Sequence, residues 1–369
     1  MTSVSSLYVH VPFCRHLCNY CDFYKQKFDN PRAQREEFSA YLRASWERHE
    51  SIMRTRGVQW SELQTVYLGG GTPSLWDVEG AEVLASLWKE RVSLSKSCEF
   101  TFEVDPGAWT HAGLLAWERI GVNRYSVGTQ SLDAGYLRVL DRDHNRAQTF
   151  ALLEHLRGKN FSVDFLLGAP QVNKEREVLR ELAELLSYEP KHLSLYILQP
   201  AAGYKLKARI PTDEVVGREY LSVSEYLRSR GFNHYEVSNF SLPGFESKHN
   251  LKYWLGESVA ALGPTGTGYF SLSKEQAYRY KWKPGRAEIE DEVLGVSELE
   301  LERLYLRLRL NLPFVASEIM SSPVFSSLLV KWQGRGLVEG LDGAWRMRPQ
   351  GWVVLDSLMD EVFAATSRK

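Results

Sequence analysis

Three cysteines near the start of the chain have the spacing C-x3-C-x2-C and are the residues best suited to bind a metal. Thiolates are soft ligands that favour iron–sulfur clusters or zinc. A four-iron cluster held by three cysteines leaves one iron for another ligand, whereas a structural zinc ion needs a fourth protein ligand, for which His10 or His16 is available. Buried or surface thiols without a metal are the third interpretation. Because three thiols fall so close together, the spacing favours a [4Fe–4S] cluster with Cys14, Cys18 and Cys21 as ligands.

The segment that must position these cysteines is a short apolar strand directly before them, the first of several strand-like segments. Helical patterns separate these segments, and this alternation predicts a parallel α/β sheet with right-handed crossovers. Eight strand–helix units would close a barrel, so six units predict a partial (β/α)6 barrel, with an open doubly wound sheet as the alternative. The predicted strands cover residues 7–12, 65–68, 99–104, 124–128, 162–167 and 192–198.

Glycines and polar residues recur at or near the carboxyl ends of these strands, the edge at which parallel α/β folds bind ligands. The run Gly69-Gly70-Gly71-Thr72 either makes a tight turn or lets a ligand approach the backbone. Glu103, Gln130 and Asp164 are polar groups on buried strands, and each needs a partner because an unpaired buried polar group costs about 1–3 kcal/mol. Structural hydrogen bonds would explain each residue as well as a ligand does. Their position along one edge, with the cysteines, favours a binding site.

The composition describes a soluble globular protein, with 369 residues, 44% hydrophobic and 25% charged residues and a formal net charge of −1. This balance gives no electrostatic basis for binding nucleic acid or an anionic membrane, so we expect neither partner. Cys98 lies in an apolar alternating segment and is expected to be a buried strand residue. No signal-like segment precedes the first strand and no long apolar run follows, so we expect no integral membrane segment and a cytoplasmic location.

Several segments spread through most of the chain carry the motifs of a known family. They are Leu7–Cys14, the cysteine motif itself, Tyr67–Ser74, Gly128–Asp133, His192–Tyr196, Tyr235–Phe240 and His249–Trp254. With these motifs the chain resembles the radical S-adenosylmethionine (SAM) superfamily. Within it, the chain resembles the branch of oxygen-independent coproporphyrinogen III oxidase and the HemW haem chaperones. The first segments are typical of the whole superfamily, whereas the last two are much narrower.

The resemblance implies a set of cofactors and the residues that bind them. Cys14, Cys18 and Cys21 would ligate a [4Fe–4S] cluster whose remaining iron chelates the methionine part of SAM. The positions that match the family around SAM, or match its polar residues further along the rim, are Tyr8, Tyr20, Gly70, Gly71, Thr72, Glu103, Gln130, Arg142 and Asp164.

Two departures from the oxidases favour the haem chaperones. Cys21 is followed by Asp22-Phe23 where the oxidases carry a further cysteine, and the first strand begins by residue 7, without their N-terminal extension. In the HemW family the stretch His-Asn-x-x-Tyr-Trp is associated with haem binding, which implies that His249 ligates the haem iron. Apo-haemoproteins would then receive the haem. The alternative is a coproporphyrinogen III oxidase or another radical-SAM enzyme with a large substrate; a homodimer stays open.

The strand–helix alternation stops at about residue 290, which predicts a separate C-terminal unit. Helical patterns cover 297–309, 316–335 and 350–364, and Asp342-Gly343 predicts a hairpin turn. Helices with a hairpin resemble a winged-helix unit, although the overall charge does not favour DNA binding. The sequence therefore predicts three parts: the barrel with its cluster and SAM sites at 1–240, a connecting segment at 241–290 and a small, mostly helical domain at 291–369.

Overall fold

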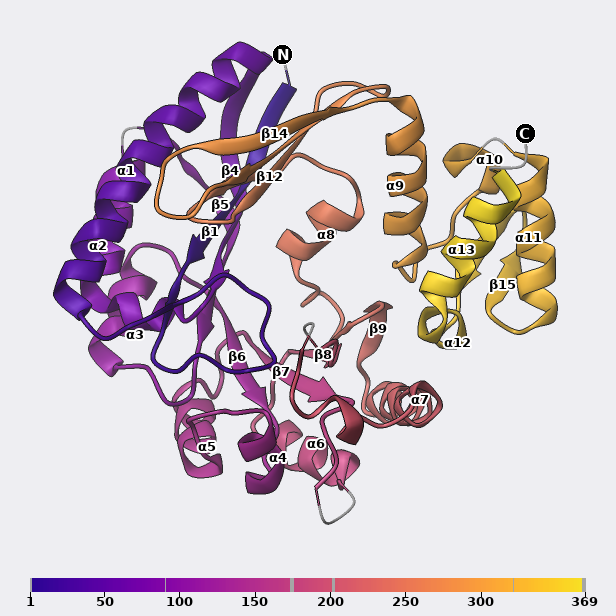
Figure 1. Ribbon diagram of the computed structural model, residues 1–369, viewed down its shortest axis with the longest axis horizontal. Helices are drawn as coiled ribbons and strands as arrows, with labels where there is room; N and C mark the ends of the chain where they lie inside the picture. Colours follow the sequence, from indigo (N-terminus) through magenta and orange to yellow (C-terminus); the bar gives the residue numbers. More distant parts are fainter. Residues whose placement is uncertain (1, 90, 173–175, 201–202, 321, 367–369) are drawn as a thin grey trace.

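The computed structural model describes residues 2–89, 91–172, 176–200, 203–320 and 322–366. Within these residues, nine strands form one curved sheet in the order β11-β1-β4-β5-β6-β7-β8-β10-β9 (Figure 1). Its central strands follow chain order and pair in parallel, which confirms the predicted partial (β/α)6 barrel. They are β1 (Thr2–Val11), β4 (Val58–Gly70), β5 (Leu94–Val104), β6 (Arg124–Gln130), β7 (Phe161–Leu167) and β8 (His192–Ile197).

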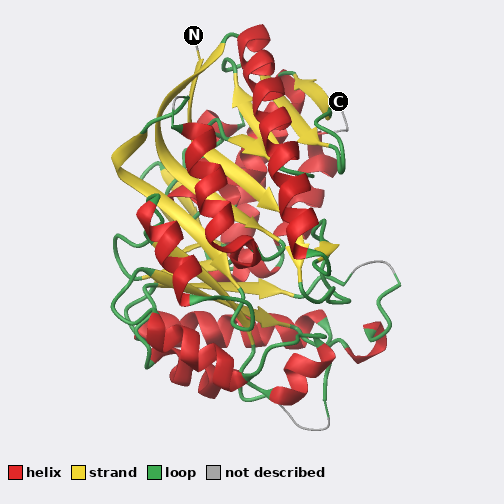
Figure 2. Cartoon of the chain, turned by 90° about the vertical axis from the view of Figure 1, so that its left-hand side faces the viewer, coloured by secondary structure: helices red, strands yellow, loops and turns green. Residues whose placement is uncertain are grey.

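Helices cover the convex face of this sheet (Figures 1 and 2). The alternation of strand residues explains the packing, because every second side chain points to the same face. In β5, Phe100 packs on Trp88 with ring centroids 5.4 Å apart, and Phe102 packs on Trp117 at 4.7 Å. The covering helices are α1 (Pro31–Arg56), α2 (Asp77–Trp88), α3 (His111–Arg119), α4 (Ala134–Val139), α5 (Arg146–His155), α6 (Val178–Leu186) and α7 (Asp213–Ser229).

The concave face of the sheet is polar. The residues of β5 that alternate with its phenylalanines are Glu99, Thr101 and Glu103, and each has a polar partner. On the neighbouring strands Ser126 donates hydrogen bonds to both carboxylate oxygens of Asp164, at 3.0 and 2.9 Å. The same period of two therefore supplies an apolar face for the helices and a polar face for the site.

The sheet extends beyond the predicted strands at both edges. Next to β1 lies β11 (Ala260–Leu262), which pairs with it in parallel. Next to β8 lies β10 (Asn239–Ser241), followed by β9 (Asn233–Glu236), both in antiparallel pairing. Because β11 comes from the predicted connecting segment at 241–290, that segment contributes a strand to the main sheet.

The rest of the segment after β10 forms a helix and a second sheet. The helix is α8 (Lys248–Trp254), whose N-terminus is capped by Ser247, since its side chain accepts a hydrogen bond from Asn250 N. The antiparallel sheet joins β12 (Thr267–Ser271), β13 (Ala277–Trp282) and β14 (Ile289–Leu294). In Figure 1 this sheet passes over the concave side of the barrel near β1.

The last part of the chain packs at the side of the barrel, to the right in Figure 1. Its elements are α9 (Val296–Leu308), α10 (Ala316–Ile319), α11 (Pro323–Gly334), the hairpin of β15 (Val338–Leu341) and β16 (Ala344–Met347), α12 (Pro349–Val353) and α13 (Leu355–Thr366). The segment expected to be helical at 316–335 contains residue 321, which lies outside the described residues. The boundaries of the three predicted parts remain a prediction. No helix in the described ranges is long and apolar enough to cross a membrane.

Candidate functional site

A cavity of about 400 Å³ lies at the carboxyl ends of the parallel strands, beneath the cysteine loop, which we define as residues 14–25. Eleven of the thirteen site residues predicted from the sequence line it. They are Cys14, Cys18, Tyr20, Cys21, Gly70, Gly71, Thr72, Glu103, Gln130, Arg142 and Asp164. The structure therefore brings together residues from the loop, from the carboxyl ends of β4, β5 and β6, from the middle of β7 and from the segment between α4 and α5.

Short strands hold the two ends of the cysteine loop together. The strand β2 (Phe13–Cys14) pairs in parallel with β3 (Gln26–Lys27), and Phe28 N donates to Cys14 O at 2.8 Å. The Cys14 thiol lies 3.8 Å from Thr72 Oγ1. This pairing fixes where the loop leaves and rejoins the barrel, and places its thiols over the rim.

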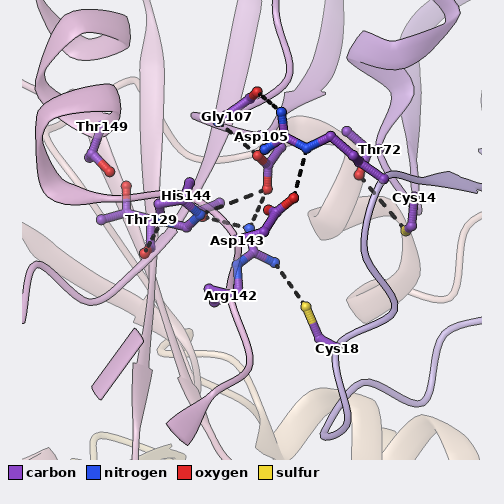
Figure 3. A network of polar contacts seen from close by, with 12 residues as sticks. Cys14, Cys18, Thr72, Asp105, Gly107, Thr129, Arg142, Asp143, His144 and Thr149 are labelled. Atoms are coloured by element: carbon purple, nitrogen blue, oxygen red, sulfur yellow. Dashed lines mark hydrogen bonds and ion pairs between the residues drawn. The ribbon is translucent and has the colours of Figure 1, made fainter. Parts of the chain in front are cut away.

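The thiols of the loop lie in surroundings that favour the protonated form until a metal binds. Burial raises the pKa of Cys14 to about 11 and also raises the pKa of Cys18. The Arg142 guanidinium, whose Nη1 lies 3.9 Å from Cys18 Sγ, acts in the opposite direction on Cys18 (Figure 3). Because metals bind thiolates, loading the loop with a metal has to displace these protons.

The histidines available to a zinc site have other partners. His10 uses both ring nitrogens, with Nε2 2.8 Å from Tyr24 O and Nδ1 3.1 Å from Tyr8 Oη. His16 lies on the loop, but its Nε2 is 2.9 Å from Asp141 Oδ1. This arrangement favours a ligand set of three thiols over a tetrahedral zinc site completed by histidine.

The glycines are required by packing within the protein itself. The sequence predicted instead a tight turn or the close approach of a ligand. A Cβ atom on Gly70 would lie 2.6 Å from the His10 ring, and one on Gly71 would lie 2.5 Å from Phe13 O. Gly70 also has a φ of +112°, which side chains rarely adopt. The space freed by these glycines therefore admits the protein's own β1 and the start of the cysteine loop, although both glycines also line the cavity.

Two carboxylates face the cavity beyond the glycines. Glu103 accepts hydrogen bonds from Tyr67 Oη at 2.9 Å and from Gly70 N at 3.0 Å. Burial, with the negative charge of Asp164 nearby, raises the pKa of Glu103 to about 7, and burial also raises the pKa of Asp164. A cationic ligand group in this cavity would therefore favour the ionised form of both carboxyls.

Arg142 is held by a network that the sequence did not reveal (Figure 3). It forms an ion pair with Asp105 and donates to Gly128 O at 3.2 Å. Nearby, Arg15 Nε lies 2.7 Å from Asp143 Oδ2. Oxygen and nitrogen atoms of Asp105, Asp143 and His144 lie within 4.8 Å of one another, but the two guanidinium groups already neutralise both carboxylates. The network thus orients Arg142 toward the cysteine loop. Asp105 was detectable only as the residue directly after a predicted strand.

Gln130 reaches the cavity through an unusual backbone conformation. Its φ is +60°, and the pairing of β6 with β7 shifts register between Val127 and Gln130. Its carbonyl accepts a hydrogen bond from Arg176 Nη2 at 3.1 Å. A residue other than glycine in this region is strained unless its surroundings hold it, and such strain is common at binding sites.

The structure does not bring Tyr8 and His249 to this cavity. Tyr8 lines a second cavity, on the other side of the cysteine loop. His249 is 1% exposed and lies against the concave face of the sheet, with its backbone N donating to Glu99 Oε1 at 3.1 Å. Its Nδ1 is 2.9 Å from Thr65 Oγ1, while its Nε2 has no hydrogen-bond partner in the described part of the chain. The rings of Tyr67 and Tyr253 pack against it, at 5.3 and 5.4 Å.

Known proteins resemble this chain over most of its length. A profile of the Radical SAM superfamily matches residues 8–183. The Heme chaperone HemW of Lactococcus lactis subsp. lactis is 31% identical over 320 residues, covering 83% of this chain and 81% of its own. The Heme chaperone HemW of Synechocystis sp. is 31% identical over 331 residues, covering 83% and 78%.

Among solved structures, the coproporphyrinogen III oxidase (HemN) from Escherichia coli, a radical SAM enzyme, superposes with a TM-score of 0.76. It covers 96% of this chain and 89% of its own, at 18% sequence identity. At that identity the likeness concerns the fold, and it extends through the C-terminal unit as well as the barrel.

Proposed function

Since the chain belongs to the radical SAM superfamily and, within it, to the HemW family, we propose that it is a haem chaperone that binds haem and delivers it to apo-haemoproteins. The observation that carries this proposal is the 31% identity to the Lactococcus HemW over 83% of the chain, well beyond the segment that the superfamily profile matches. The described cysteines are free thiols, which suits a reducing compartment, and we place the protein in the cytoplasm.

We propose that the first cavity holds a [4Fe–4S] cluster and SAM. The three thiols of the cysteine loop fit the cluster, because soft thiolates are the ligands that iron–sulfur clusters use and no described histidine completes a zinc set. When bound, a reduced cluster can supply one electron to the sulfonium of SAM. Arg142 places a positive charge beside Cys18, which stabilises its thiolate.

The remaining residues of the cavity suit the polar groups of SAM. Glu103 and Asp164 offer carboxylates to an ammonium or hydroxyl group, and Gln130 offers an amide. Tyr196, Ile197 and Leu198 also line the cavity, and their apolar surface would help to exclude water from an occupied site. The chain thus supplies orientation and electrostatics, while the chemistry belongs to the cofactors.

We propose that His249 supplies a ligand to the haem iron. Burial lowers the pKa of His249 to about 3, so its imidazole is neutral at physiological pH, the form that binds iron. Thr65 occupies Nδ1, which leaves Nε2 available. Because the side chain is 1% exposed, haem can reach it only if a neighbouring ring such as Tyr253 moves.

Haem titration of the anaerobically reconstituted protein tests this proposal. We expect a Soret band that saturates with haem, and a shift and weakening of that band in His249→Ala. We also expect no conversion of coproporphyrinogen III in the presence of SAM and a reductant.

A matched control is His49→Ala, because His49 is likewise 1% exposed but packs on Trp60, Phe270 and Tyr280 instead of on the tyrosines around His249. Absence of haem binding by the unmodified protein, or turnover of coproporphyrinogen III, would contradict the proposed chaperone function. An unchanged Soret band in His249→Ala would remove only the ligand assignment.

A further inference from the structure

The Arg142 guanidinium faces the cysteine loop and the rim of the barrel with different nitrogen atoms (Figure 3). Its Nη1 lies 3.9 Å from Cys18 Sγ. Its Nη2 donates to Gly128 O at 3.2 Å and forms an ion pair with Asp105. Because a guanidinium is planar and rigid, the position of one terminal nitrogen fixes the position of the other. The contacts of Nη2 therefore decide whether Nη1 faces the thiol.

The Asp105 carboxylate is itself held in place in the turn after β5. Its Oδ1 accepts a hydrogen bond from Gly107 N at 2.8 Å, and its Oδ2 contacts Arg142. The side chains of Asp105 and Arg142 are 14% and 15% exposed, so the ion pair is largely shielded from water. Breaking such a pair is costly, because the remaining charge stays buried without a counterion. Asp105 therefore keeps Arg142 in one orientation.

The neighbouring charged groups do not replace Asp105. His144 Nδ1 lies 3.9 Å from Asp105 Oδ2, but burial lowers the pKa of His144 to about 4, so its ring is neutral at physiological pH. Asp143 pairs with Arg15, whose Nη1 also donates to Gly107 O. Arg15 follows the first cysteine directly, and none of its described contacts reaches a thiol. The two ion pairs thus lie close together but contact different parts of the cysteine loop.

A positive charge beside a thiolate ligand changes how readily a bound cluster accepts an electron. Reduction adds a negative charge, so a nearby cation stabilises the reduced form. The reduction potential of iron–sulfur clusters depends on such charges, on hydrogen bonds to the sulfur atoms and on solvent exposure. Arg142 Nη1 brings both a charge and an N–H group to Cys18. This orientation of Arg142 should therefore raise the reduction potential.

We infer that Asp105 is a positioning residue, which holds the Arg142 guanidinium against Cys18 and thereby makes the cluster easier to reduce. The inference rests on the cluster that we propose for the first cavity. It gives a role to a residue outside the cysteine motif, in the turn that follows β5. Asp105 acts through Arg142 and needs no contact with the cluster itself.

The charge of Asp105 and its hold on Arg142 act on the potential in opposite directions. The negative carboxylate by itself makes reduction harder, whereas the orientation that it imposes on Arg142 makes reduction easier. Asp105→Asn removes the charge but keeps an oxygen that can accept from Arg142, and Asp105→Ala removes both. The difference between these two variants therefore measures the positioning alone.

A third variant guards against a change in the turn itself. In Asp105→Ser, the hydroxyl can still accept from Gly107 N two residues on, as serine does in turns, but it is too short to reach Arg142. Asp105→Ser and Asp105→Ala should therefore have the same potential, and either one can be compared with Asp105→Asn.

The test measures the midpoint potential of the cluster by redox titration followed by electron paramagnetic resonance, in full-length chains reconstituted anaerobically. We expect a more positive potential in Asp105→Asn than in the unmodified protein. Asp105→Ala and Asp105→Ser should be about tenfold less favourable to reduce than Asp105→Asn, which for one electron is about 59 mV. Iron content should stay the same, because no variant alters a thiol.

Two controls show whether Arg142 carries the effect. In an Arg142→Gln background, Asp105→Asn and Asp105→Ala should have the same potential, since no guanidinium remains to be held. Asp143→Asn and Asp143→Ala should also match each other, because their partner Arg15 has no described contact with a thiol.

The outcomes separate this inference from the proposed cluster. Equal potentials for Asp105→Asn and the two shorter variants would overturn the inference and leave the cluster in place. The same difference in the Arg142→Gln background would also overturn it, because Asp105 would then act without Arg142. Failure of the unmodified chain to bind iron, or reconstitution with zinc alone, would remove the proposed cluster and this inference with it.

Discussion

The Glu103 carboxylate accepts two hydrogen bonds and nevertheless has a raised pKa, which is unusual. The Tyr67 hydroxyl and the Gly70 amide both favour its charged form, yet burial outweighs them, and the nearby Asp164 adds to the effect. A carboxyl in this state is close to half protonated at neutral pH, so its charge depends on what enters the cavity. Binding of a cationic ligand group beside Glu103 should therefore release a proton from its carboxyl.

SAM binding should strengthen as pH rises from 6.0 to 7.5. Glu103 has a pKa of about 7, so most Glu103 is protonated at the lower pH and must lose its proton to pair with a ligand ammonium group. Ionisation alone predicts a gain in affinity of about five- to tenfold over this interval. Dissociation constants measured at several pH values check it.

The matched variants for this pH dependence are Glu103→Gln and Asp164→Asn. In the first, affinity should fall and lose its dependence on pH. In the second, the rise should move to lower pH, since Asp164 helps to raise the pKa of Glu103. A pH profile that is the same in Glu103→Gln and in the unmodified protein would show that another group is responsible.

We expect the cysteines to divide into a cluster-binding set and a structural residue. Replacing Cys14, Cys18 or Cys21 with alanine should remove the cluster, because each thiol lines the first cavity. Cys98→Ala should keep it, since Cys98 is buried in β5 and its thiol contacts the backbone carbonyl of Glu99. Counting iron and labile sulfide per chain after anaerobic reconstitution checks both. Loss of iron in Cys98→Ala, or reconstitution with zinc alone, would be the opposing result.

At the scale of elements, the long strands were predictable and the short ones were not. The strands β4 and β5 carry apolar runs or clear alternation, so their place and their polar carboxyl ends could be inferred. In contrast, β11 is Ala260-Ala261-Leu262, which is too short to show a period, and three consecutive residues of the six in β14 are acidic. The register shift that turns Gln130 into the cavity has no sequence signal, because it depends on how β6 pairs with β7. The second cavity was missed for the same reason, since its wall comes from elements far apart in the chain.

The close contact between β1 and the end of β4 predicts that Gly70→Ala is destabilising even without ligands. The new methyl group would overlap the His10 ring, and the φ of +112° is unfavourable for alanine. We expect a loss of about 2–4 kcal/mol in the free energy of unfolding, measured in urea on the cofactor-free protein.

The matched control for this contact is Gly57→Ala, at the C-terminus of α1. Gly57 also has a positive φ, of +66°, but nothing lies within 4 Å of its Cβ position, so only about 1 kcal/mol should be lost. His10→Ala combined with Gly70→Ala should recover part of the larger loss, because the ring is then absent. Equal losses in the two glycine variants would mean that the contact with His10 is unimportant.

At the scale of the whole molecule, the C-terminal unit is joined to the barrel by buried contacts. Trp352 of α12 packs on His234 of β9, with ring centroids 4.5 Å apart, and Asn311 N, after α9, donates to Tyr235 O of β9 at 2.9 Å. A Cβ on Gly217 of α7 would lie 2.9 Å from Val353. The helical character of this unit was predictable from its apolar periodicity, but its attachment was not. Attachment of this kind favours cooperative unfolding with the barrel.

Trp352→Ala should therefore destabilise the C-terminal unit and also weaken its attachment to the barrel. Removing a large side chain that is 4% exposed should cost about 3–5 kcal/mol, and the urea transition should separate into two steps. Val330→Ala in the same unit is the control, since Val330 is 61% exposed and should change stability by less than about 0.5 kcal/mol. A single transition with similar midpoints in both variants would show that this contact does not join the two parts.

The position of β1 in the sheet sets the order in which a nascent chain can complete the site. β1 precedes the other described strands in the chain but lies inside the sheet, and its outer partner β11 follows only at Ala260–Leu262. The turn after β11 packs on β1 so tightly that a Cβ on Gly263 would lie 2.2 Å from His10 O. At about 5–20 residues per second, translation leaves this edge of β1 unpaired for on the order of 10–50 s. The cysteine loop thus emerges from the ribosome long before the sheet beneath it is complete. Because the site is complete only when the sheet is, iron should be inserted after translation. Shielding the unpaired edge of the nascent β1 should raise the yield of folded protein.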